Sequence, residues 1–215
     1  MDQTLFSDPS LAAFLVASLV LAATPGPGVL YILARTLAQG RLAGLASVAG
    51  VAIGNLANAL AAAIGLAALL ALSSLAFTIV KYAGAAYLVY LGIRALGGGR
   101  SPLAESAFGK AELLPIFRDG FVVALLNPKT ALFFAAFLPQ FIDAAASPLA
   151  QSALFGSLFV LIAVITDSLY VLSASALWPL LKHRKGARGA GRYLSAAVLI
   201  GLGVLTALSG SRSAR

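Results

Sequence analysis

The sequence contains no cysteine among its 215 residues. Disulfide bonds, thiol catalysis and cysteine-ligated metals are therefore excluded. Charged residues are scarce as well, at 10% of the chain, whereas about a quarter of the residues of a soluble domain are charged. Hydrophobic residues make up 60%, and mean hydropathy is +0.97. These values predict an integral membrane protein, and no polar block is long enough to form a second, soluble domain.

The groups on which most enzymes depend are also missing. His183 is the one histidine of the sequence, and it stands in the basic stretch Lys182–Lys185. No H-E-x-x-H motif and no paired-acid arrangement occurs. We therefore expect no enzyme activity, no metal and no cofactor. The net charge of +8 lies in short patches between apolar runs, which indicates membrane topology and anionic lipid rather than nucleic acid.

Six apolar segments follow one another along the chain. Their all-round hydrophobicity is typical of helices in lipid, not of barrel strands. A polar connector at about 98–117 divides the chain into a first half at about 10–97 and a second half at about 118–210. We predict an all-α integral membrane protein with one transmembrane domain over 1–215. The segments are placed at about Leu11–Ala34, Leu42–Leu72, Leu75–Leu96, Phe121–Ile142, Ala153–Leu177 and Tyr193–Leu208.

Basic residues predict the orientation of these segments. Arginine and lysine occur in the first, third and fifth connectors, beginning with Arg35 and Arg41, and are absent from the second and fourth. By the positive-inside rule the odd-numbered connectors are cytoplasmic, and both termini lie outside. The competing topology has five spans, a first segment that does not cross, and the N-terminus inside.

Two of the segments are interrupted by proline. Proline removes a backbone donor and its ring clashes with the preceding turn, so neither helix continues unbroken. With three spans each, the two halves are inverted relative to one another, and paired interruptions in an inverted repeat indicate a transport site at the midplane. A simple kink in a packed helix is the alternative. The polar side chains at both breaks favour a substrate site, formed by Thr24, Pro25, Gly26, Pro27, Gly28, Asn127, Pro128 and Lys129.

Asp167 stands inside the fifth apolar segment. A carboxylate at that depth is costly unless it is paired, hydrated or protonated, so we predict that it couples protons or binds a substrate ammonium group. An ion pair with Lys129 or Lys81 that holds helices together is the structural alternative. Lys129 is itself expected either to bind a substrate carboxylate or to neutralise Asp167 in one conformation.

Asn55 and Asn58 stand three residues apart in the second segment and therefore share a helix face. These asparagines either form hydrogen bonds between helices or line the cavity, and the sequence does not favour one role over the other. Gly50 and Gly54 form a pattern of small residues that lets two helices approach closely. Similar small-residue faces at Gly84 and Gly203 allow packing within one chain or in a homodimer.

Several of these motifs together resemble the amino-acid exporters of the lysine-exporter (LysE/RhtB) type. The resemblance extends over nearly the whole chain. One departure concerns the second helix, where Asn58 stands at the position at which many relatives have histidine. The motifs are the break at Thr24–Gly28, Gly40-Arg41 with Gly44, Ala83–Leu88 with Leu91-Gly92, Phe117–Gly120, Leu126–Lys129, Phe133-Phe134 and Phe137–Phe141.

The resemblance implies a multi-pass protein of the bacterial cytoplasmic membrane that exports amino acids in exchange for protons. It lies nearest the homoserine/threonine branch, whose expected substrates are small neutral amino acids or their lactones. A lysine/arginine-type exporter, or a channel or permease for another metabolite, is the alternative. The acid at Asp167 also fits the family, and Asn58 removes any titration role of the histidine.

Overall fold

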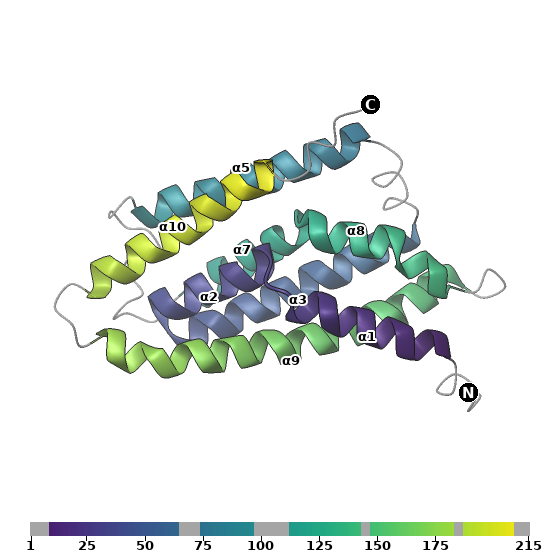
Figure 1. Ribbon diagram of the computed structural model, residues 1–215, viewed down its shortest axis with the longest axis horizontal. Coiled ribbons are helices and arrows are strands. Elements are labelled where there is room, and N and C mark those ends of the chain that lie inside the picture. The colour runs from purple at the N-terminus through teal and green to yellow at the C-terminus, as the bar shows by residue number, and fades with distance from the viewer. Residues whose placement is uncertain (1–8, 65–73, 97–111, 143–146, 183–186, 209–215) are drawn as a thin grey trace.

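The computed structural model describes residues 9–64, 74–96, 112–142, 147–182 and 187–208. His183, Asp143 and most of the predicted connector at 98–117 lie outside these residues. Every regular element in the described part of the chain is a helix, as expected of an all-α membrane protein (Figure 1). Its helices are α1 (Pro9–Ala23), α2 (Pro27–Gln39), α3 (Arg41–Ala63), α5 (Ser74–Leu96), α7 (Leu113–Leu125), α8 (Pro128–Ala136), the short 3₁₀ helix η2 (Leu138–Phe141), α9 (Pro148–Lys182) and α10 (Ala187–Leu208).

The lengths and hydropathies of these helices fit a multi-pass arrangement. Within the described ranges, α3, α5 and α9 are each long and apolar enough to cross a membrane. The number rises to five if each of the bent pairs α1–α2 and α7–α8 is one span, and α10 adds a shorter apolar stretch at Ala196–Leu208. Successive segments run in alternating directions along the bundle (Figure 1).

Both predicted breaks are present. The axis bends by 45° between α1 and α2 and by 51° between α7 and α8. Pro27 and Pro128 are the first residues of the helices that follow the breaks, where a missing N–H and a fixed φ do no harm. Neither interrupted segment is therefore a simple kinked helix, because a new helix begins after each break.

The start of the fourth segment was predicted wrongly. Helix α7 begins at Leu113 rather than near Phe121, so Arg118 and Asp119, which precede the predicted start of the segment, belong to its helix. Asp119 is 4% exposed, and Arg35, assigned to the first connector, is 2% exposed in α2. Arg35 and Asp119, two charged residues outside the six predicted segments or at their ends, are thus buried in the bundle.

Glycines bring α3 and α7 into backbone contact. A Cβ built on Gly54 would lie 2.6 Å from the carbonyl oxygen of Phe121, and one on Gly50 would clash with the carbonyl oxygen of Phe117. Helices α5 and α10, which lie side by side along one flank of the bundle (Figure 1), meet in the same way, since Gly203 faces the carbonyl of Ala85. The small-residue faces at Gly84 and Gly203 thus pack within one chain.

Gly50→Ala is expected to lower the free energy of unfolding by about 3 kcal/mol, because the new methyl group must push backbone away rather than a flexible side chain. Thermal unfolding of the purified protein in detergent measures this. Gly201→Ala is the matched control, since nothing lies within 4 Å of a Cβ there. Equal melting temperatures for the two variants would contradict the close contact of α3 with α7.

Two apolar clusters lie on either side of the breaks. One contains Tyr31, Val48 and Val171, and the other contains Phe14, Ala59 and Phe155. Along the chain, Thr24, Asn55, Asn127 and Asp167 each stand between a member of one cluster and a member of the other. These four polar residues therefore lie at a level between the two apolar clusters, where the breaks meet.

A polar cavity between two broken helices

A small cavity lies where the two breaks face each other. Its volume of about 40 Å³ is enough for about three water molecules and too small for an amino acid. One acid and one lysine are among the residues around it. The lining residues are Leu21, Ala22, Thr24, Gly26, Gly28, Val29, Val51, Asn55, Asn127, Lys129, Thr130, Phe159, Ala163 and Asp167.

Most of the residues proposed from sequence meet at this cavity. Those that line it are Thr24, Gly26, Gly28, Asn55, Asn127, Lys129 and Asp167. Pro25, Pro27, Pro128 and Asn58 are not among its lining residues. Pro27 and Pro128 begin their helices, and the Nδ2 of Asn58 donates to the carbonyl of Ala124 at 2.9 Å. Asn58 therefore joins α3 to α7 in this conformation.

The end of α1 is held by side chains from other helices. Lys129 donates through Nζ to the carbonyl oxygens of Leu21 at 2.9 Å and Thr24 at 2.6 Å. Tyr170 donates to the carbonyl oxygen of Ala23 at 2.8 Å. The stem of Lys129 crosses Gly26, where a Cβ would lie 3.1 Å from its Cδ. The carbonyls freed by the first break thus accept hydrogen bonds from Lys129 and Tyr170.

The two helices that begin at the breaks differ in how their N-termini are capped. Asn127 caps α8 with its side chain, which accepts a hydrogen bond from the backbone N–H of Lys129 at 3.1 Å. No side chain caps α2, whose N-cap is Gly26. The first N–H groups of a helix have no partner within it and carry partial positive charge. The N-terminus of α2, with Gly28 and Val29 on the cavity wall, is therefore the better position for an anionic group.

Two further groups at the cavity offer acceptor atoms. Asp167 is 5% exposed, and its carboxylate makes no ion pair within 4.0 Å with Lys129 in the part of the chain that the structure describes. Asn55 is also 5% exposed, and its Oδ1 has no hydrogen-bond partner among the described residues. Both residues are among those that line the cavity.

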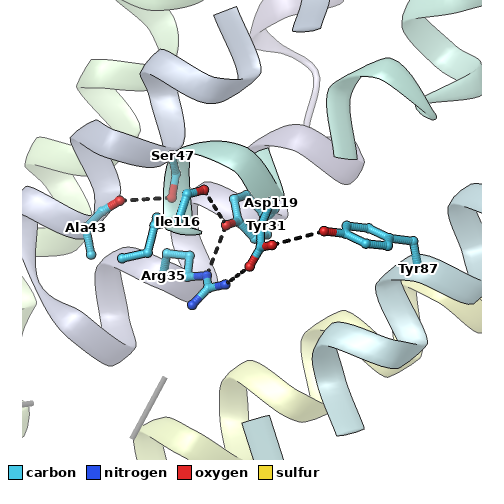
Figure 2. A network of polar contacts seen from close by, with 7 residues as sticks. All are labelled: Tyr31, Arg35, Ala43, Ser47, Tyr87, Ile116 and Asp119. Atoms are coloured by element: carbon cyan, nitrogen blue, oxygen red, sulfur yellow. Dashed lines mark hydrogen bonds and ion pairs between the residues drawn. The ribbon is translucent and has the colours of Figure 1, made fainter. Parts of the chain in front are cut away.

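A second polar cluster was missed by the sequence reasoning (Figure 2). Arg35 pairs through Nη2 with Asp119 Oδ2 at 2.7 Å, and its Nε donates to the hydroxyl of Tyr31 at 3.1 Å. Tyr87 donates to Asp119 Oδ1 at 3.0 Å, and Tyr31 donates to the carbonyl of Ile116 at 2.9 Å. The available signal was the charge of Arg35 and Asp119 next to apolar runs. From the sequence alone, Arg35 is interpreted as a signal of membrane orientation and not as part of a buried ion pair.

Comparison with known proteins agrees with a membrane translocator. A family model described as LysE type translocator matches residues 19–210. The chain is 32% identical over 176 residues to the homoserine/homoserine lactone efflux protein of Salmonella typhimurium, covering 80% of this chain and 84% of that protein. It is 29% identical over 211 residues to the uncharacterized membrane protein YrhP of Bacillus subtilis, covering 93% and 99%.

Another match is shorter. An uncharacterized membrane protein of Vibrio cholerae is 36% identical over 132 residues, which cover 61% of this chain and 64% of that protein, less than two thirds of its length. No solved structure matches the chain at a significant level.

Proposed function

This chain belongs to the LysE type translocator family, and on that premise we propose that it exports small neutral amino acids or their lactones from the bacterial cytoplasm. The observation that supports this most is the polar cavity between the two broken helices. It combines an uncapped helix N-terminus with the carboxylate of Asp167. The efflux function in the name of the Salmonella relative supports the direction of transport.

In the proposed binding mode the two ends of the substrate are recognised separately. Its carboxylate, or the carbonyl of a lactone, binds the free N–H groups at the N-terminus of α2. Its ammonium group binds Asp167, with Asn55 as a second acceptor. The cavity has room for about three waters in this conformation. Binding therefore requires a rearrangement that widens it, and rocking of the two inverted halves provides one.

Proton antiport follows from the same carboxylate in this proposal. Asp167 binds the substrate ammonium on the cytoplasmic side and a proton on the outer side, so each proton that enters replaces one substrate. In the proposed orientation the odd-numbered connectors face the cytoplasm and both termini lie outside. Because Arg35 is buried in α2, it does not support this orientation. The support comes from Arg41, which is exposed at the start of α3, and from the basic residues of the later connectors.

The lining of the cavity favours neutral over basic substrates. Apart from Asp167, its described lining contains no acid, and Val29, Val51, Phe159 and Ala163 form apolar wall. An unpaired ammonium on a lysine side chain would therefore lose its hydration without a partner. A lysine-type exporter would need a second carboxylate at this wall.

Export from loaded vesicles tests the function. Membrane vesicles containing the protein are expected to release homoserine, threonine or homoserine lactone faster than vesicles without it. They should release lysine or arginine about tenfold more slowly than these substrates, a difference that needs only about 1.4 kcal/mol of discrimination. Radiolabelled amino acids, assayed with an imposed proton gradient, provide the measurement. A panel in which no amino acid or lactone leaves faster would contradict the proposal.

A further inference from the structure

The buried cluster of Tyr31, Arg35, Tyr87 and Asp119, named here the Arg35–Asp119 layer, lies at a definite distance from the cavity. Along α2, Arg35 follows Gly28 by seven residues, or about 10 Å of helix. Along α7, Asp119 precedes Asn127 by eight residues, or about 12 Å. Because α2 runs away from the cavity and α7 toward it, both displacements point to the end of the bundle where α2 passes into α3 at Gly40.

The layer fills that end of the bundle. Tyr31, Arg35 and Asp119 are 0%, 2% and 4% exposed. A Cβ on Gly120, next to Asp119, would lie 2.9 Å from the carbonyl oxygen of Ser47 and 3.3 Å from Cε1 of Tyr31. Helices α2, α3 and α7 are thus in contact at this level. A substrate that passes between α2, α3 and α7 from the Gly40 end must separate these contacts.

Asp119 connects three helices through its two carboxylate oxygens. Oδ2 accepts from Arg35 on α2, and Oδ1 accepts from Tyr87 on α5, while Asp119 itself belongs to α7 (Figure 2). Helices α2 and α5 belong to the predicted first half of the chain and α7 to the second. A movement of the halves relative to one another therefore strains both bonds of the same carboxylate.

A buried ion pair contributes little net free energy to the stability of a fold. The desolvation of both charges offsets much of their attraction, and well-packed apolar residues of similar volume are often as stable. This pair is also incomplete, since Nη1 of Arg35 is buried and without a hydrogen-bond partner among the described residues. Such a pair suits an element with two arrangements, one bonded and one hydrated.

We propose that the Arg35–Asp119 layer is the gate that closes the cavity toward the Gly40 end of the bundle, which is the cytoplasmic end in the proposed orientation. Opening separates Asp119 from Arg35 and Tyr87, and water then solvates the exposed charges. Toward the opposite end Phe159 lines the cavity and packs against Phe133 and Phe134, with ring centroids 5.1–5.5 Å apart. The inference rests on the proposed function insofar as the cavity is the transport site.

Accessibility of a single cysteine tests the gate directly, because the native chain has none. Ala163→Cys places the reporter on the cavity wall. In inside-out vesicles, a membrane-impermeant thiol reagent is expected to modify it slowly. Asp119→Asn or Arg35→Gln should raise the rate about tenfold, which corresponds to the same shift in the population of the open gate. The double exchange Arg35→Asp with Asp119→Arg should restore slow modification.

Asn58→Ala is the matched control, because it also removes a buried hydrogen bond between helices but lies farther from Gly40 than the cavity does. It should leave the rate unchanged. Tyr87→Phe, which removes one bond and no charge, should raise the rate about threefold and covers the case in which the charge variants do not fold. Slow modification in Tyr87→Phe and in every folded charge variant would overturn the gate. Faster modification in a protein that exports no amino acid would instead refute the proposed function and leave the gate standing.

Discussion

Asp167→Asn is expected to abolish proton-driven export, with a loss of about a hundredfold or more in the initial rate. Loss of one partner of a buried charge pair costs about 2–5 kcal/mol, and each 1.4 kcal/mol is a factor of ten. Asparagine has nearly the same shape as aspartate but carries no charge for a substrate ammonium and takes up no proton. Both proposed tasks of the carboxylate should therefore fail together in the variant.

The measurement is efflux of a labelled amino acid from vesicles with and without a proton gradient. Thr166→Val is the matched control, because its hydroxyl bonds to the carbonyls of Ile162 and Ala163 in its own helix and it is not among the lining residues of the cavity. Unchanged efflux in Asp167→Asn would remove the residue from the mechanism. Native export that is insensitive to a collapsed proton gradient would remove antiport and leave transport intact.

Substrate exchange without a gradient separates the two tasks of Asp167. Labelled substrate outside the vesicle exchanges for unlabelled substrate inside, and no net proton movement is needed. If the carboxylate binds the ammonium group, Asp167→Asn should stop this exchange as well. Exchange at the native rate, with net export lost, would restrict Asp167 to proton coupling.

The breaks and the buried acid were predictable from sequence because their signals are local. A proline inside an apolar run kinks or ends a helix, and the structure confirms both bends. Asp167 is conspicuous because placing an acidic side chain of such a run against lipid costs a large free energy. These signals were enough to identify most of the polar residues around the cavity before any tertiary structure was known.

The partners of the charged residues were not predictable, because they depend on how the helices pack. Arg35 and Asp119 stand near the ends of apolar runs, where a charge normally indicates a connector. Their pairing follows from the early start of α7 at Leu113 and from the close approach of Gly120 to α2 and α3. Asn55 and Asn58 share a helix face, but they have different roles in the structure. Asn55 lines the cavity, whereas Asn58 donates a hydrogen bond to α7.

Lys129 differs from the other cavity residues in that its ammonium group already has two acceptors. Sequence reasoning assigned it to the substrate carboxylate or to Asp167. The structure places it on the carbonyl oxygens of Leu21 and Thr24, so it joins the end of α1 to the start of α8. In this conformation it neutralises the negative end of one broken helix and fixes the distance between the two breaks.

Lys129→Met is therefore expected to reduce stability and transport together. It leaves two carbonyl oxygens without donors, at about 1–3 kcal/mol each when buried, with the lower value applicable to Thr24 because that residue is exposed. The melting temperature in detergent should fall by several degrees, and efflux should drop about tenfold or more. Tyr170→Phe is the graded control, since it removes one neutral donor from the neighbouring carbonyl of Ala23. It should therefore lower the melting temperature less.

Lys129→Arg distinguishes a connection between the breaks from a substrate contact. Arginine keeps the charge and offers more donors, so the carbonyls of α1 retain partners and the melting temperature should stay near the native value. If Lys129 instead binds the substrate carboxylate, Lys129→Met should weaken substrate binding and leave the melting temperature unchanged. A native melting temperature in Lys129→Met would thus contradict the connection, and it would return Lys129 to the role that the sequence alone suggested.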